Sequence, residues 1–268
     1  MTPPIRLVVS DVDGTLVTSD KVLTDASVAA VGRLRDAGIR FAVTSGRPPR
    51  GMEMLVGPLA VRDPIGGFNG GLIVRPDLTV LEERRLPPSV VAPLIEALDG
   101  HGVDVWCYQG NDWLVRDADA PHVAREAATV EFPPTVRASF DDLADEVVKV
   151  VGVSDDPAAI AAALAGVHAT FGADVSASTS QPYYLDVTHP DANKGNVIAY
   201  LSRTLGIAHE EIAAIGDGPN DALMFAVCGL SVAMGNASDV VRRSANEVTS
   251  SNDEDGFASA MDRFVLGA

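Results

Sequence analysis

The segment "RLVVSDVDGTLV" (residues 6–17) joins an apolar run to a pair of aspartates. The run of residues 7–10 is short and mainly apolar, and polar residues follow it at once. This pattern is typical of a strand buried in a parallel sheet. Asp11 and Asp13 come directly after this run, and Gly14 follows them. Because the ligands of open parallel sheets bind at the carboxyl ends of the strands, we expect both carboxylates to lie at a binding edge.

Two further segments have the same pattern. Residues 39–44 form an apolar run that is followed by Ser45 and Gly46, and residues 212–215 form another that stops shortly before Asp217. Each of these runs ends where chemically useful side chains begin. If the three strands are neighbours in one parallel sheet, their following loops meet at the same edge.

Helical patterns separate these strands. Residues 24–38 have apolar positions on one face, a cap at Thr24 or Asp25 and a stop at Gly38. A second helix is predicted to begin at "NKG" and to end at Gly206. Towards the C-terminus we expect helices over residues 221–227, 238–244 and 253–265, and a strand over residues 230–233. Such alternation predicts a Rossmann-like α/β core, a mostly parallel sheet with helices on both faces.

The middle of the chain has a different texture. Two strand candidates flank the turn letters "GN", and "EVVKVVGV", "GADVSAS" and "YYLDVT" are three more. The segments "LPPS" and "SDDP" place a proline near the first turn of a helix. We therefore expect an α+β cap domain over residues 83–186, inserted into a catalytic core made of residues 1–82 and 187–268.

Composition and charge exclude several classes of partner. The 268 residues are 47% apolar and carry a formal charge of −17, so we expect neither nucleic acid nor an anionic membrane surface as a partner. No apolar run approaches the roughly 20 residues of a membrane span and no signal peptide is evident, which makes the cytoplasm the expected location. Cys107 and Cys228 match no metal-ligand spacing and are expected to be ordinary reduced residues.

The predicted meeting of strand ends would bring Asp11, Asp13, Asp217 and Asp221 into a small volume. Two carboxylates about 4 Å apart repel each other by about 4 kcal/mol at an effective dielectric constant near 20. Something cationic must therefore lie among them. Ligands that are all oxygen favour Mg²⁺, which proteins usually hold with one or two carboxylates, water and substrate phosphate.

Four motifs carry a resemblance to a known family. In order and surroundings, "DVDGT", "TSGR", "NKG" and "GDGPND" resemble the signature motifs of the haloacid dehalogenase superfamily. The position of the inserted domain is similar to that of the C2 cap in the Cof-type branch. The resemblance implies a Mg²⁺-dependent phosphatase that hydrolyses a small phosphorylated metabolite, such as a sugar phosphate or a phosphorylated cofactor, through an aspartyl-phosphate.

The resemblance also implies a role for each catalytic residue. Asp11 corresponds to the nucleophile, and Asp13 to the general acid that protonates the departing alcohol and then activates water. Ser45 is expected to bind a phosphoryl oxygen, assisted by backbone N–H groups near Gly46. Lys194 is expected to screen the nucleophile from the incoming phosphate.

The metal ligands follow from the same resemblance. Asp217 is expected to bind Mg²⁺ directly, alongside the Asp11 carboxylate and the Asp13 backbone carbonyl. Asn220 and Asp221 form a supporting shell that orients metal-bound water. The roles of two further residues stay open at this point. Asn69 of "FNGG" either contributes to phosphate binding or has no direct role, and Arg47 either contacts substrate or is a solvated arginine at a helix start.

Other functions compete with this interpretation. A phosphomutase could use the same aspartyl-phosphate, and a non-catalytic binding or regulatory module could retain the same scaffold. A nucleotide-binding dehydrogenase is disfavoured because no G-x-G-x-x-G follows the first strand. The physiological substrate and the oligomeric state do not follow from the sequence. Several aromatic residues of the cap are candidates either for lining the site or for core packing: Trp106, Tyr108, Trp113, Tyr183 and Tyr184.

Overall fold

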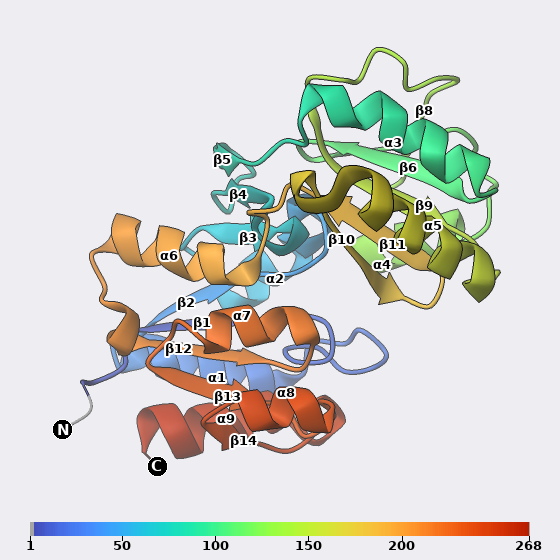
Figure 1. The fold of residues 1–268 in the computed structure, drawn as a ribbon. Helices are drawn as coiled ribbons and strands as arrows, with labels where there is room; N and C mark the ends of the chain where they lie inside the picture. The colour runs from blue at the N-terminus through green and yellow to red at the C-terminus, as the bar shows by residue number, and fades with distance from the viewer. Residues whose placement is uncertain (1–2, 268) are drawn as a thin grey trace.

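A computed structural model describes residues 3–267, which form two lobes (Figure 1). The larger lobe contains a five-stranded sheet in which every pairing is parallel. Its strands, in spatial order, are β14 (Glu247–Val248), β13 (Leu230–Ala233), β12 (Ile212–Gly216), β1 (Leu7–Ser10) and β2 (Arg40–Val43). The predicted fold class, a mostly parallel α/β core with an additional α+β part, is confirmed.

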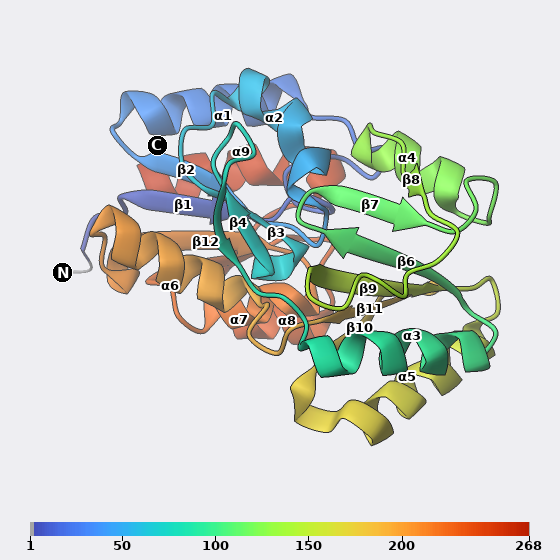
Figure 2. The same cartoon turned by 90° about the horizontal axis from the view of Figure 1, so that it is seen from above.

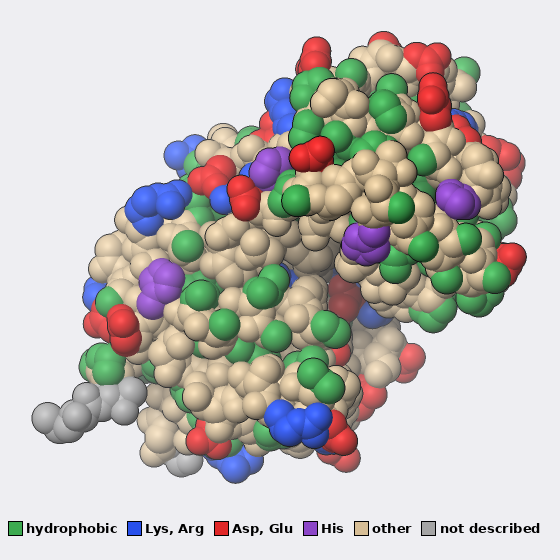
Figure 3. All heavy atoms as spheres, in the orientation of Figure 1, with side chains coloured by type: hydrophobic (Ala, Val, Ile, Leu, Met, Phe, Trp, Pro, Cys, Tyr) green, Lys and Arg blue, Asp and Glu red, His purple; other side chains and the backbone are tan. Residues whose placement is uncertain are grey.

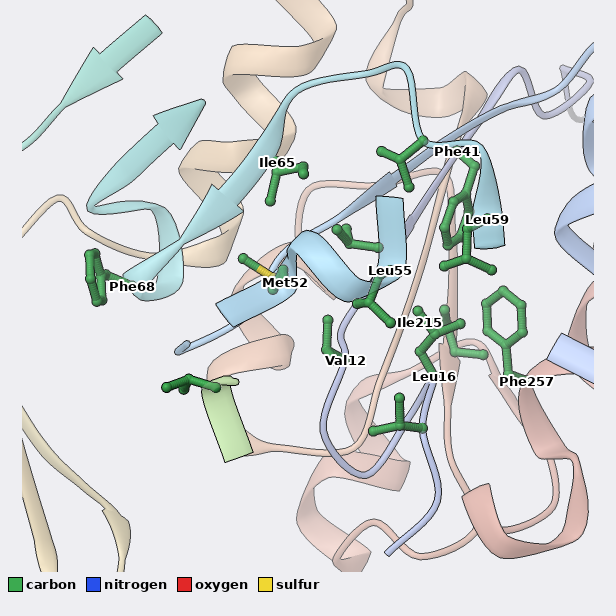
Figure 4. Packing of buried hydrophobic residues seen from close by; sticks show 14 of the residues in the cluster. Val12, Leu16, Phe41, Met52, Leu55, Leu59, Ile65, Phe68, Ile215 and Phe257 are labelled. Carbon is green, nitrogen blue, oxygen red and sulfur yellow. The ribbon is translucent and has the colours of Figure 1, made fainter. Parts of the chain in front are cut away.

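Helices cover both faces of this sheet, as Figure 2 shows. One face carries α1 (Asp25–Asp36), α2 (Glu53–Leu59) and α9 (Gly256–Ala260), and the other carries α6 (Lys194–Leu205), α7 (Ala222–Phe225) and α8 (Asp239–Ser244). Successive side chains of a strand point to opposite faces of the sheet, which explains why apolar residues pack against both groups of helices. Val8 and Ile215 pack with the first group, while Leu7 and Ala214 pack with the second. Figure 4 shows the first layer around Leu16, Leu55 and Phe257.

Local sequence signals set the helix ends. Thr24 is the residue that caps α1, because its side-chain oxygen accepts a hydrogen bond from Ser27 N at 3.2 Å. Asn193 caps α6 in the same way through Asn196 N at 3.0 Å, and Gly206 ends that helix in the left-handed region at φ 63°. The cap on α6 fixes the next residue, Lys194, at the first helical position.

The second lobe is built on a six-stranded sheet. The strands are, in spatial order, β10 (Ser176–Gln181), β11 (Tyr184–Thr188), β9 (Val147–Val153), β6 (Asp104–Gln109), β7 (Asp112–Val115) and β8 (Thr135–Val136). Helices α3 (Pro88–Gly100) and α5 (Pro157–Phe171) pack on one face, and α4 (Val123–Val130) lies on the side of the larger lobe. The division of the chain at residues 83 and 186 stays a prediction.

A small antiparallel sheet connects the lobes. It consists of β3 (Ile65–Gly67), β4 (Leu72–Val74) and β5 (Val80–Glu83), for which the sequence analysis proposed no strands. Short 3-10 helices flank it: η1 (Pro49–Met52) and η2 (Phe68–Gly70). The remaining 3-10 helices are η3 (Gly172–Asp174), η4 (His209–Glu211), η5 (Pro219–Asp221) and η6 (Asn252–Glu254).

Two predicted helices differ from the structure. The helix expected over residues 221–227 is the short α7, preceded by η5. The closing helix expected over residues 253–265 is divided into η6, α9 and the π-helical segment η7 (Met261–Leu266). The division follows from Asp255, whose left-handed φ of 53° separates η6 from α9. Among residues 3–267, no helix is both long enough and apolar enough to cross a membrane.

Candidate active site

The parallel register brings three predicted loops to one edge of the core sheet. Ser10 lies opposite Val43 of β2 and Ile215 of β12, so these strands end at the same level. Asp11 and Asp217 therefore project from neighbouring strand ends. Figure 3 shows that the surface is hollowed where the two lobes meet.

Lys194 lies at the centre of this edge. Its Nζ is 2.5 Å from Asp11 Oδ1 and 2.6 Å from Asp221 Oδ1, and its side chain is 1% exposed. A cation is unfavourable at the positive end of a helix, so the two carboxylates compensate for its position at the start of α6. Burial alone would lower the pKa of Lys194, but Asp11 and Asp221 outweigh burial and raise that pKa above its ordinary value.

Three carboxylates cluster beside this lysine, and two of them, Asp11 and Asp221, contact it. Asp11, Asp217 and Asp221 each place an oxygen within 4.8 Å of the others. Burial, followed by the charge of Asp221, raises the pKa of Asp11 well above its usual range, although Lys194 acts in the opposite direction. The same two causes, in the same order, raise the pKa of Asp217. One ammonium group therefore does not balance the negative charge of the cluster.

Backbone and hydroxyl groups fix the orientation of these carboxylates. Asp221 Oδ2 accepts hydrogen bonds from the backbone N–H groups of Asp217 and Gly218, at 2.9 and 2.8 Å. The turn after Asp11 passes directly over Asp217. Gly14 has a φ of +77°, and a Cβ atom there would lie 2.4 Å from Asp217 Oδ2, so any other residue would be strained and would displace the Asp217 carboxylate. Thr15 Oγ1 lies within hydrogen-bonding distance of Asp217 Oδ1, at 3.2 Å.

Asp13 faces a different set of partners. Arg47 Nε is 2.6 Å from Asp13 Oδ2, Arg47 Nη2 is 2.7 Å from Asp13 Oδ1, and Lys21 Nζ is 2.7 Å from Asp13 Oδ1. Burial raises the pKa of Asp13, but Arg47 and Lys21 together outweigh burial and lower that pKa to about 2. The carboxyl group is therefore ionised in this arrangement.

Arg47 is buried and links the lobes. Its side chain is 5% exposed, so the alternative of a solvated arginine is wrong. Besides binding Asp13, its Nη1 donates to the backbone oxygen of Gly51 at 3.3 Å and to that of Thr129 at 3.0 Å. Thr129 belongs to α4, so a single guanidinium group contacts the DVDGT turn, its own loop and the second lobe.

The other candidate phosphate ligands lie on adjoining loops. Ser45 is buried, and its Oγ accepts a hydrogen bond from Arg47 N at 3.1 Å. Asn69 N donates to the backbone oxygen of Ser45 at 2.8 Å, and Asn69 Oδ1 accepts from Asn220 Nδ2 at 2.9 Å. A Cβ atom on Gly46 would lie 3.7 Å from the Asn69 amide group. The structure thus brings Ser45, Gly46, Asn69 and Asn220 together.

Comparison with known proteins settles the family. A model of the haloacid dehalogenase-like hydrolases matches residues 8–261. The chain belongs to this family. The resemblance drawn from the four motifs is therefore confirmed, and with it the predicted class of enzyme, a hydrolase of the phosphomonoesterase type.

Named relatives and solved structures of similar size support the assignment. This hydrolase is 28% identical over 271 residues to 5-amino-6-(5-phospho-D-ribitylamino)uracil phosphatase of Bacillus subtilis, with 96% of this chain and 97% of the relative covered. It is 29% identical over 264 residues to pyridoxal phosphate phosphatase of Escherichia coli, with 94% and 96% covered. The crystal structure of a haloacid dehalogenase-like hydrolase from Bacteroides thetaiotaomicron has a TM-score of 0.86 at 30% identity, covering 97% of this chain and 99% of that chain.

The residues of the hydrolase fit the divalent cation that the family implies. The clustered donors are carboxylate oxygens, the hard ligands that Mg²⁺ prefers. The pKa values of Asp11 and Asp217 are raised first by burial and then by the charge of Asp221, and a bound cation would oppose both effects. Asp221 is the most enclosed of the three, because its oxygens already bind Lys194 and two backbone N–H groups.

Two polar residues near this edge were not predicted from the sequence. Asn236 Nδ2 donates to the Gly14 backbone oxygen at 2.9 Å and contacts Asp217 Oδ2 at 3.3 Å. The signal was available, because Asn236 follows the correctly predicted strand β13 and so comes from a fourth strand end. Lys149 of β9 was missed as well; its Nζ lies 3.4 Å from the backbone oxygen of Gly46.

The aromatic residues of the cap pack mainly against one another. Trp106 and Trp113 are each 1% exposed, with their ring centroids 5.1 Å apart in an edge-to-face arrangement. Tyr108 packs against Phe68 of η2 at 5.0 Å, and Tyr183 stacks on His122 at 4.2 Å. In this structure, core packing describes the two tryptophans better than a site-lining role.

Proposed function

We propose that this hydrolase removes the phosphoryl group from a phosphomonoester of a small metabolite, such as a sugar phosphate or a phosphorylated cofactor, through an aspartyl-phosphate on Asp11. One observation carries the proposal: Asp11 is a buried carboxylate at a strand end, 2.5 Å from Lys194 Nζ and among further acidic side chains. A rigid backbone and local positive charge are what phosphoryl transfer requires. The relatives named above, which act on phosphorylated small molecules, support the same reaction class.

In the first half-reaction, an oxygen of Asp11 attacks phosphorus and the bond between phosphorus and the alcohol oxygen breaks. Asp13 supplies the proton that the departing alcohol takes up. Ser45 Oγ and the backbone N–H groups near Gly46 bind the phosphoryl oxygens, and Lys194 neutralises the charge that builds up beside Asp11. Asn69 holds the Ser45 loop in place through its backbone hydrogen bond.

In the second half-reaction, water attacks phosphorus, Asp13 takes the proton of that water, and the bond between Asp11 and phosphorus breaks. Inorganic phosphate leaves, and both carboxyl groups return to their starting states. Against the effect of burial, Arg47 and Lys21 lower the pKa of Asp13 to about 2, which favours the ionised form that accepts a proton. For Asp13 to serve as the acid of the first step, its ion pair with Arg47 has to open.

We also propose that Asp11, Asp217 and the Asp13 backbone carbonyl hold Mg²⁺, with Asn220 and Asp221 orienting the water molecules around it. When bound, the ion supplies charge neutralisation for the transferring phosphoryl group. Asp221 additionally fixes Lys194, because it is the second carboxylate partner of that ammonium group. Thr15 and Asn236 hold the Asp217 carboxylate in place.

Trapping of the covalent intermediate tests this proposal. Brief reaction with a ³²P-labelled phosphomonoester, followed by acid quenching, should leave label on the protein that hydroxylamine releases, as expected of an acyl phosphate. Release of free phosphate without isomer formation distinguishes a phosphatase from the phosphomutase alternative. The non-catalytic alternative predicts loss of a catalytic side chain, whereas Asp11, Asp13, Ser45, Lys194 and Asp217 are all present.

The remaining expectations stay predictions drawn from composition. A formal charge of −17 disfavours nucleic acid and anionic membranes as partners. We propose a small phosphorylated metabolite as the partner and the cytoplasm as the location. Fractionation of cells that express the tagged protein would test the location.

A further inference from the structure

All the lysines of this acidic chain lie near the proposed site. The sequence has 20 basic residues, and the only lysines among them are Lys21, Lys149 and Lys194. Lys21 binds Asp13, and Lys194 binds Asp11. Lys149 comes from the cap, and its Nζ faces the backbone oxygen of Gly46 in the TSGR loop. Lys194 has a role in the mechanism proposed above and Lys21 pairs with the general acid Asp13, whereas Lys149 has no such role.

The Lys149 ammonium group is buried and incompletely bonded. Its side chain is 9% exposed, and its Nζ lies 3.0 Å from Asp186 Oδ2. The contact with the Gly46 oxygen is 3.4 Å long, beyond the usual range of an N–H···O hydrogen bond. An ammonium group has three N–H donors. Within residues 3–267, Asp186 is the one ion-pair partner of Lys149, and Lys149 is the one ion-pair partner of Asp186.

The position of this pair on the cap sheet is fixed by register. Lys149 lies opposite Tyr108 of β6 and Thr188 of β11, and alternation places its side chain on the sheet face that looks toward the core lobe. The rings of Phe68 and Tyr108 lie 5.8 and 6.0 Å from its Nζ. Burying an ion pair is costly and seldom stabilises a fold more than apolar packing would, which favours a functional reason for this one.

The surroundings of the pair indicate which chemistry it would bind. Glu126 of α4 is half-buried on the same side of the cap, with Tyr184 Oη 3.4 Å from its Oε2. Burial raises the pKa of Glu126, and the charge of Asp186 adds to this effect while Lys149 opposes it. The cap therefore offers two acidic groups and one ammonium group here, and the charge of the Arg47 guanidinium, which also acts on Glu126, is paired with Asp13. A second anion on the ligand would meet an excess of negative charge, whereas neutral hydroxyl groups would not.

We propose that Lys149 and Asp186 bind the alcohol portion of the phosphate ester and select leaving groups that carry vicinal hydroxyl groups. One hydroxyl donates to the Asp186 carboxylate, and its neighbour accepts from the Lys149 ammonium group in place of the weak Gly46 contact. This inference rests on the proposed function, because it assigns the leaving-group side of the same site.

Matched esters test the inference. Sorbitol 6-phosphate carries vicinal hydroxyl groups, hexyl phosphate has the same chain length without them, and p-nitrophenyl phosphate reports on the chemistry alone. Wild-type enzyme should prefer sorbitol 6-phosphate to hexyl phosphate. Lys149→Met should lower kcat/KM for sorbitol 6-phosphate by about 10- to 100-fold, the effect of losing one hydrogen bond to a charged group. The loss with the other two esters should be at least tenfold smaller.

Control variants separate selectivity from damage. Asp186→Asn should reproduce the selective loss. Arg116→Met removes a cation from a more exposed ion pair of the cap, with Asp99, and should leave the preference unchanged. Equal losses for all three esters in Lys149→Met would overturn the inference, and so would a Lys149-dependent preference for 6-phosphogluconate, which adds a carboxylate, over sorbitol 6-phosphate.

A footprinting measurement keeps this inference separable from the proposed function. Even if the enzyme does not hydrolyse sorbitol 6-phosphate, binding of this ester should protect Lys149 from acylation by acetic anhydride, as detected by mass spectrometry. Hexyl phosphate should give no such protection. The same measurement serves if Lys149→Met fails to fold. Failure of wild-type enzyme to hydrolyse any ester would reject the proposed function alone. Equal acylation of Lys149 with and without sorbitol 6-phosphate would reject the subsite.

Discussion

Arg47 binds both carboxylate oxygens of Asp13, through Nε at 2.6 Å and Nη2 at 2.7 Å, and the same guanidinium group donates to the Thr129 backbone oxygen of the cap at 3.0 Å. The residue assigned as general acid is therefore tied to the position of the cap. Opening of the cap would remove one partner of Arg47 and loosen its hold on Asp13. We therefore expect cap movement and the protonation of Asp13 to be coupled through the Arg47 side chain.

Replacement of Arg47 by lysine should impair turnover. A lysine ammonium group cannot bind both Asp13 oxygens in a fork while also reaching the cap, so kcat/KM for an aryl phosphate should fall by about tenfold or more. Arg33→Lys is the matched control, because Arg33 binds Asp262 through two nitrogens, both at 2.9 Å, on the exposed surface. The control should stay within about twofold of wild type. Equal kinetics in the two variants would contradict the role assigned to Arg47.

Asp11→Asn should abolish turnover and preserve the fold. The substitution keeps the volume of the side chain but removes the nucleophile, so phosphate release from p-nitrophenyl phosphate with Mg²⁺ should fall by about 10³-fold or more. The exposed variant Asp174→Asn serves as the control. Far-ultraviolet circular dichroism and Tm would show whether Asp11→Asn is folded. A folded variant with full activity would remove Asp11 from the mechanism.

The core of the site was predictable because the signal is local. Each parallel strand is a short apolar run, and the polar residues follow it directly, as with Asp11 after β1 and Asp217 after β12. Parallel pairing then aligns the strand ends without further information. Lys194 was predictable for a similar reason, since a lysine at a helix start is unfavourable unless acidic groups compensate.

The features of the site that could not be predicted from the sequence depend on contacts between residues far apart along the chain. Arg47 meets Thr129 only because the cap docks on the core, 82 positions away along the chain. Lys149 faces the site because of its register on β9. An irregularity of the strand pairing near Tyr108 hides the alternation of inward and outward side chains in the sequence. The strands β3 and β4 have three residues each, too few to show a period of two.

Removal of divalent cations should stop the reaction, and Mg²⁺ should stabilise the protein. EDTA should eliminate phosphate release, and added Mg²⁺ should restore it. Because Mg²⁺ relieves repulsion among buried carboxylates, a concentration of 100 times its Kd should stabilise the folded state by about 2.7 kcal/mol. Thermal scans should show this as a rise in Tm for wild type and a smaller rise for Asp217→Asn. Unchanged rates in EDTA together with an unchanged Tm would exclude the metal.

Acid should weaken the contribution of Asp13 to stability. Its pKa is lowered from 3.8 to about 2 in the folded protein, so the unfolded chain binds the proton more tightly. The contribution is therefore fully present above the unfolded pKa and is lost as the pH falls through the folded pKa. Urea unfolding should show a constant difference in unfolding free energy between wild type and Asp13→Asn from pH 5 to 8, which narrows between pH 4 and 2. Asp20→Asn removes an exposed carboxylate from the same loop and serves as the control. A difference that stays constant down to pH 2 would show that Arg47 and Lys21 do not hold Asp13 ionised.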